Sequence, residues 1–249
     1  MPHTPHIAQK CLSLSGDGAE LHGELFTPES ALPLPGVVLL HDRHGLTGHV
    51  RDTARRLAAQ GYAVLVFDLF SRGDGDRQDP PSREQSRKLS FFPDERAVRD
   101  VQAALARLRS EPGVDPKRIA LGGFSFGARY SLLTAGTGED VAALFLFYPV
   151  IIYPELHASR PRQPLSLVHA IKCPVMTVFG EKDWMVPLPH QTFMEALRKG
   201  HGLPRECIRY PSVGHGFFNE EIKQYDKAVA EDAFARLIAF LERHIKRTG

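Results

Sequence analysis

The chain has 249 residues, a formal net charge of +2 at neutral pH, and hydrophobic residues at 43% of its positions. Its nearly balanced charge argues against a nucleic-acid-binding protein, which would gather Lys and Arg on one face. The length suits one large α/β domain with a buried core, so we expect residues 1–249 to form a single domain. Its three cysteines are an odd number without metal-ligand spacing, which is typical of a reducing compartment and predicts no disulfide framework.

No segment of the sequence predicts export or membrane insertion. The N-terminus lacks an apolar signal core. The longest apolar stretch, residues 141–153, is broken by Pro149 and is too short to span a bilayer. We therefore expect a cytoplasmic protein that does not associate with membranes.

Strands and helices are predicted to alternate along most of the chain, after an initial hairpin that turns at residues 16–18. The predicted strands are residues 11–15, 20–26, 37–41, 63–67, 118–122, 142–147, 175–180 and 207–211. The predicted helices are residues 49–60, 94–110, 189–199 and 221–246, with one more helix opening after Ser125. This alternation predicts an α/β fold with a mostly parallel central sheet and helices on both faces.

Two long irregular segments interrupt this pattern. Residues 71–92 are rich in Arg, Asp, Gln and Pro and are interpreted as a mobile surface excursion, whose end at Phe91 and Phe92 can still reach the site. Residues 149–167 leave the sheet one strand after Ser125, and we expect them to form a lid or a pocket wall.

The pentapeptide GFSFG at residues 123–127 is the strongest functional signal, because of where it lies. It follows a predicted buried strand and opens into a predicted helix, which is the setting of a nucleophile elbow. There, Ser125 would be held above the sheet edge as a nucleophile. The amide of Phe126 would lie at a helix N-terminus, where backbone donors favour an oxyanion. The alternative for the pentapeptide is a glycine-rich turn with a solvated serine.

Partners for a nucleophilic serine follow in the order that such elbows require. Asp183 comes just after the predicted strand 175–180, and parallel strands place catalytic groups at their carboxyl ends. His215 lies between two glycines in the loop after the last predicted strand. Taken alone, Asp183 suits a turn and His215 a surface loop, but the three placements together favour a Ser–His–Asp triad. Glu181 is the alternative acid.

The motifs together resemble the dienelactone hydrolase family of α/β-hydrolases, over residues 23–245. The matching segments are VVLLHDRHG at residues 37–45, GYAVLVFDL at 61–69, GFSFG at 123–127, GEKD at 180–183 and GHGF at 214–217. The resemblance implies the α/β-hydrolase fold and places the catalytic triad at Ser125, Asp183 and His215.

The resemblance also assigns residues around the triad. In addition to the amide of Phe126, it places a second oxyanion donor at the amide of Arg43. It also places an acidic residue near the nucleophile at Asp42. Two departures concern the substrate. The founding enzymes carry a cysteine nucleophile where this chain has Ser125, and an arginine shortly after the histidine, which residues 216–219 lack. The serine resembles that of a general carboxylesterase or lactonase.

Several side chains near the triad positions are candidate substrate contacts. Trp184 and Phe217 flank the acid and the histidine and are expected to line an apolar pocket, with core packing as the alternative. His41 is interpreted as a pocket-wall or hydrogen-bonded loop histidine, and Asp42 either modulates the nucleophile or braces its loop. His41, Asp42 and His44 offer metal ligands, but no further ligand stands at zinc-site spacing, so we expect no metal. No cofactor is required.

These observations predict a serine hydrolase that cleaves small carboxylic esters or lactones through an acyl-enzyme. It would bind a small-molecule substrate and no nucleic acid. We expect it to be a monomer or a homodimer. One alternative is a noncatalytic ligand-binding or interaction module on the same scaffold, since fold does not imply function. A second alternative is a thioesterase.

Overall fold

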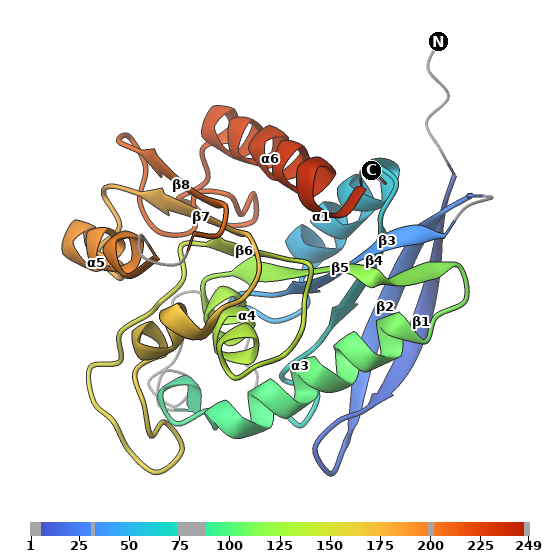
Figure 1. Cartoon of the computed structure of the whole chain (residues 1–249), viewed down its shortest axis with the longest axis horizontal. Helices are drawn as coiled ribbons and strands as arrows, with labels where there is room; N and C mark the ends of the chain where they lie inside the picture. The colour runs from blue at the N-terminus through green and yellow to red at the C-terminus, as the bar shows by residue number, and fades with distance from the viewer. Residues whose placement is uncertain (1–5, 31–32, 74–87, 199–201, 247–249) are drawn as a thin grey trace.

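The computed structural model describes residues 6–30, 33–73, 88–198 and 202–246, and within these ranges eight strands form one sheet (Figure 1). The strands are β1 (Ile7–Ser15), β2 (Glu20–Pro28), β3 (Leu34–Leu40), β4 (Ala63–Phe67), β5 (Val114–Phe124), β6 (Ala143–Phe147), β7 (Val175–Gly180) and β8 (Arg205–Tyr210). Their order across the sheet is β1-β2-β4-β3-β5-β6-β7-β8. The hairpin strand β2 runs antiparallel to β1 and β4, while β4, β3 and β5 to β8 are parallel to one another. The predicted mostly parallel sheet is confirmed.

Helices cover both faces of this sheet, as the sequence predicts. α1 and α6 lie on one face, and α3 and α4 lie on the other (Figure 1). The helices are α1 (Gly48–Ala59), α3 (Asp94–Arg109), α4 (Phe126–Gly136), α5 (Leu188–Arg198) and α6 (Lys227–Leu241), with the 3-10 helix η1 (Pro164–Ala170) and the π-helical turn η2 (Glu242–Lys246).

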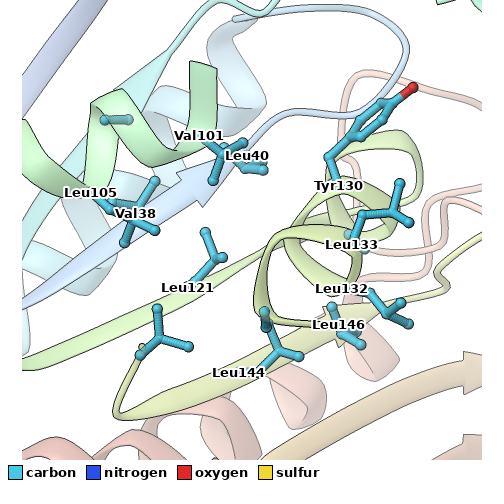
Figure 2. Close-up of a cluster of buried hydrophobic side chains, with 14 of the residues drawn as sticks. Val38, Leu40, Val101, Leu105, Leu121, Tyr130, Leu132, Leu133, Leu144 and Leu146 are labelled. Atoms are coloured by element: carbon cyan, nitrogen blue, oxygen red, sulfur yellow. The ribbon is translucent and has the colours of Figure 1, made fainter. Parts of the chain in front are cut away.

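The central strands are apolar at nearly every position because both of their faces are covered. In β3, Val38 and Leu40 pack towards α3 and α4, whereas Val37 and Leu39 pack towards α1 and α6. This division follows from the period of two in a strand, which sends successive side chains to opposite faces. Figure 2 shows the first cluster, in which Val38 and Leu40 lie with side chains of α3, α4, β5 and β6.

The last helix is shorter than predicted. The sequence predicts a helix over residues 221–246, but α6 begins at Lys227 and ends at Leu241, where η2 follows. The start is fixed by Asp226, whose carboxylate accepts a hydrogen bond from the amide of Val229 at 3.1 Å and caps the helix. The residues before it form successive turns, with the amide of Ile222 donating to the carbonyl of Asn219.

The two irregular segments meet at the start of α3. Most of the prediction for residues 71–92 falls on residues 74–87, which lie outside the described residues. Its end reaches the elbow as expected, because the buried ring of Phe92 packs 5.2 Å from that of Phe126. In the segment 149–167, the Tyr153 hydroxyl donates to Asp94 at 2.7 Å and the carbonyl of Ser159 accepts from the Asp94 amide at 2.9 Å. These contacts fasten the segment beside α3.

The segments that the structure describes contain no helix with the length and apolar character needed to cross a membrane.

Candidate active site

Ser125 sits in a strained turn between β5 and α4. Its backbone angles are φ 50° and ψ −105°, which a side chain-bearing residue rarely adopts. Backbone strain of this kind reduces the free energy of unfolding by about 1–3 kcal/mol, and it persists only where the surrounding structure holds the residue in place. The fixing bond here comes from the Ser125 amide, which donates to the carbonyl of Phe147 in β6 at 2.9 Å.

The two glycines of the elbow are required by close backbone approach. A Cβ on Gly123 would lie 2.5 Å from the carbonyl oxygen of Leu40, and a Cβ on Gly127 would overlap the carbonyl oxygen of His41. The start of α4 therefore lies directly against the end of β3. This brings the loop after β3, which carries Arg43, beside the helix N-terminus, where Phe126 is the first residue. The amide of Phe126 is one of those that a helix does not pair internally.

Ser125, His215 and Asp183 form one hydrogen-bonded chain. The Oγ of Ser125 is 2.7 Å from Nε2 of His215, and Nδ1 of His215 is 2.7 Å from Oδ2 of Asp183. A carboxylate only accepts hydrogen bonds, so Nδ1 carries the imidazole proton and Nε2 is free to accept from the serine hydroxyl. The side chain of Asp183 is fully buried, whereas that of His215 is 14% exposed.

The backbone that follows Asp183 holds its carboxylate in place. Oδ1 accepts hydrogen bonds from the amides of Met185 at 2.8 Å and Val186 at 2.9 Å. With Oδ1 fixed in this way, Oδ2 has a defined direction towards His215. The alternative acid, Glu181, is exposed.

Tyr148 is a neighbour of the histidine that the sequence analysis missed. It follows β6 directly, has a positive φ of 39°, and its amide donates to the carbonyl of Val178 at 2.7 Å. Its buried ring lies 4.9 Å from the ring of His215. Burial, followed by the charges of Asp42 and Asp183, raises its pKa well above the usual value, so the phenol is neutral. Its position after a parallel strand is the signal that would have found it.

Asp42 braces the loop after β3. Its Oδ1 accepts from the amide of His44 at 2.8 Å and lies 3.0 Å from Nδ1 of the same residue. Its Oδ2 accepts from the Asn219 side chain at 3.1 Å. Burial raises the pKa of Asp42, but the hydrogen bonds and charge of His44 outweigh it and hold the pKa below the usual range. Both oxygens thus have protein partners, which supports the interpretation that Asp42 braces its loop, and a contact with substrate stays a prediction.

His41 also has partners within the protein. Its Nδ1 lies 2.6 Å from the Asp42 carbonyl, and its Nε2 accepts from the amide of Leu69 at 2.9 Å. The ring is fully buried and ties the ends of β3 and β4 together. His41 is therefore hydrogen-bonded within its loop, in line with the second of the two interpretations given for it, and a contact with substrate stays a prediction.

The two aromatic candidates differ in exposure. Phe217 is completely buried among Tyr148, Tyr210 and the core under α6, which is the core packing given as its alternative. It follows Gly216, whose positive φ of 81° marks a turn of the chain. Trp184 is 81% exposed. Its ring faces solvent beside Asp183.

Among the described residues, no group of three or more His, Cys, Asp or Glu side chains could hold a metal ion. Asp42, His41 and His44 are joined by hydrogen bonds as described above.

The sequence model of the dienelactone hydrolase family matches residues 21–245 of this chain. Among curated proteins, the chain is 28% identical over 246 residues to a protein of Yersinia pestis named "Putative carboxymethylenebutenolidase", covering 97% of this chain and 90% of that protein. It is 25% identical over 252 residues to a Bradyrhizobium protein named "Probable 2-oxo-3-(5-oxofuran-2-ylidene)propanoate lactonase", covering 98% of this chain and 99% of that one.

Solved structures agree on the fold. A crystal structure from Klebsiella pneumoniae, described as a "Putative Dienelactone Hydrolase", superposes with a TM-score of 0.86 at 24% identity and covers 96% of this chain and 100% of its own. The acylaminoacyl peptidase of Pyrococcus horikoshii superposes with a TM-score of 0.78 at 15% identity, covering 98% of this chain and 42% of its own. The predicted α/β-hydrolase fold is confirmed.

Proposed function

The chain belongs to the dienelactone hydrolase family, and we propose that it is a serine hydrolase that cleaves small carboxylic esters or lactones through an acyl-enzyme. The observation that carries this proposal is the pair of 2.7 Å contacts that link Ser125, His215 and Asp183. Family membership supports a hydrolase, and the names of the relatives support an ester or lactone bond as its target.

In the proposed mechanism, Nε2 of His215 takes the hydroxyl proton of Ser125 while Oγ attacks the ester carbonyl. Asp183 holds the imidazole tautomer and stabilises the imidazolium that forms. The amides of Phe126 and Arg43 would bind the oxyanion of the tetrahedral intermediate. His215 then returns the proton to the leaving alcohol, which breaks the ester C–O bond. Water repeats the sequence on the acyl-enzyme, forming the acid and regenerating the serine.

Trp184 is proposed as a contact for the substrate at the mouth of this site. The bonds from Met185 and Val186 to Asp183 hold the turn that carries it, so the exposed indole has a fixed backbone next to the triad acid. A large exposed aromatic ring at such a place suits recognition of an apolar group.

The test compares wild type with Ser125→Ala on p-nitrophenyl acetate and butyrate, followed by lactones and an acyl-CoA. We expect turnover of the esters or lactones and a loss of at least about 10³-fold in the variant. Preferred turnover of the acyl-CoA would make the protein a thioesterase. Equal slow turnover by both proteins would contradict the triad and favour the noncatalytic binding module.

A further inference from the structure

A second histidine–carboxylate pair lies next to the proposed triad. His49, the second residue of α1, places Nδ1 at 2.6 Å from Oε2 of Glu220. Glu220 lies in the loop after β8, five residues beyond His215. The two partners are separated by 171 positions in the sequence, so the pair joins α1 to the loop that carries the proposed base.

The ring of His49 also contacts the segments that carry the two reacting side chains. It lies 4.9 Å from the ring of Phe124, the residue before Ser125, and 5.8 Å from that of Phe218, three residues after His215. The side chain is completely buried, and the two rings that it contacts stack on each other, with their centroids 5.2 Å apart. His49 therefore touches the end of the nucleophile strand and the histidine loop at once.

Electrostatics favour this docking of the loop. α1 has no acidic residue in its first turn, and Thr47 at its N-cap makes no side-chain capping bond. The carboxylate of Glu220 instead reaches the start of α1 from the histidine loop, where the helix dipole favours negative charge. Burial raises the pKa of Glu220, but the hydrogen bond from His49 outweighs it, so its pKa is lowered and the carboxylate is charged at neutral pH.

We propose that His49 and Glu220 are positioning residues, which fasten the loop of His215 to α1 and to the nucleophile strand and so keep His215 within hydrogen-bonding distance of Ser125. This inference rests on the proposed function for its kinetic consequence, since general-base catalysis depends on this distance. The fastening itself is a property of the fold and does not depend on turnover.

Two substitutions remove the contact in different ways. His49→Phe keeps an aromatic ring against Phe124 and Phe218 but removes the nitrogen. Glu220→Ala removes the carboxylate from a side chain that is 41% exposed, so it leaves no buried cavity. Glu220→Gln is the conservative variant, because its amide oxygen still accepts from Nδ1 of His49. Glu231→Ala is the matched control, since it removes a 2.9 Å ion pair to Arg56 that also ties α1, but to α6.

The first readout is hydrogen–deuterium exchange of peptides covering residues 211–226. We expect faster exchange there in His49→Phe and Glu220→Ala, a smaller increase in Glu220→Gln, which keeps the hydrogen bond without the charge, and wild-type exchange in Glu231→Ala. Unchanged exchange in Glu220→Ala would overturn the inference. This readout needs no substrate, so it decides the inference even if wild type hydrolyses no ester and the proposed function fails.

The second readout is steady-state kinetics on p-nitrophenyl acetate. For His49→Phe and Glu220→Ala we expect kcat to fall about tenfold with KM changed less than about twofold, since misplacement of a base affects the chemical step. Glu220→Gln should recover most of kcat. The double variant should be no slower than the slower single variant, because both changes remove one contact. A loss of kcat in the double variant that equals the product of the two single losses would overturn the inference.

Discussion

At the scale of single residues, the site depends on how each polar atom is held. Asp183 uses one oxygen for two backbone amides and the other for His215. This division fixes the imidazole tautomer, and it gives the carboxylate a role in the proposed mechanism although it does not touch the proposed nucleophile.

Asp183→Asn tests this division of roles. The asparagine oxygen can still accept from the amides of Met185 and Val186, but its NH₂ group then faces Nδ1 of His215 and forces the other tautomer. We expect kcat for p-nitrophenyl acetate to fall about 10⁴-fold, the magnitude of the same change in another hydrolase triad. The circular dichroism spectrum should stay that of wild type. Activity within tenfold of wild type would show that Asp183 does not orient the histidine.

Trp184 provides a direct probe of ligand binding, because it is the one tryptophan in the chain. A ligand that covers the 81% exposed indole should shift its emission to shorter wavelength. We expect a saturable shift when a lactone without ultraviolet absorbance is added to Ser125→Ala. Trp184→Ala should raise KM a few-fold with kcat retained. Unchanged emission at concentrations of lactone that inhibit wild-type ester hydrolysis would remove Trp184 from the site.

At the scale of elements, the elbow works because β3 and α4 approach each other without side chains between them. Gly127, near the start of α4, packs against the carbonyl of His41, in the loop that also carries Arg43. The elbow and the proposed oxyanion loop are therefore parts of one packing arrangement.

Gly127→Ala should separate these elements. The added methyl group meets a backbone carbonyl, which cannot rotate away, so we expect the free energy of unfolding to fall by about 1–3 kcal/mol. The shift of the His41 carbonyl should also lower kcat. Urea denaturation and ester kinetics measure the two effects. A variant as stable and as active as wild type would contradict this close approach.

At the scale of the whole molecule, one sheet brings together residues that are far apart in the sequence. The carboxyl ends of β3, β5, β6, β7 and β8 carry or precede the residues of the site. Additional bonds such as Asn219 to Asp42 then join the loops at this edge.

These carboxylate bonds predict how stability depends on pH. The pKa values of Asp42 and Glu220 are lowered in the folded protein, so their contribution is complete above the usual carboxyl pKa and is lost as pH falls below it. We expect the free energy of unfolding to decrease below about pH 4. Denaturation of Asp42→Asn across pH checks this: its deficit relative to wild type should be largest at neutral pH and shrink in acid. A deficit that is constant with pH would contradict the assignment.

Sequence patterns predicted the elements well because the central strands are apolar and the helices are periodic. The strands 63–67 and 175–180 agree with β4 and β7 at both ends. The spacing of Ser125, Asp183 and His215 likewise pointed to one site. The packing of that site was not predictable in the same way, because it depends on contacts between distant positions. His49 and Glu220 are 171 positions apart, and neither carries a local motif.

Contacts between distant positions also decide which of the two aromatic candidates is exposed. Phe217 and Trp184 both flank predicted site residues, and hydrophobicity alone does not distinguish them. Phe217 follows the turn at Gly216 and is buried, whereas Trp184 follows Asp183 and is exposed. The early start predicted for α6 has a related cause. Ile222 and Tyr225 continue the helical spacing of α6 backwards, but the chain there is turned by bonds such as that of the Asp226 amide to the Phe217 carbonyl.

The proposed mechanism requires that Ser125 becomes acylated during turnover. The most direct test is intact-mass spectrometry after exposure to a fluorophosphonate, with peptide mapping of the product. We expect one adduct on Ser125 in wild type and none in Ser125→Ala. No adduct in wild type, or an adduct that persists in Ser125→Ala, would contradict it.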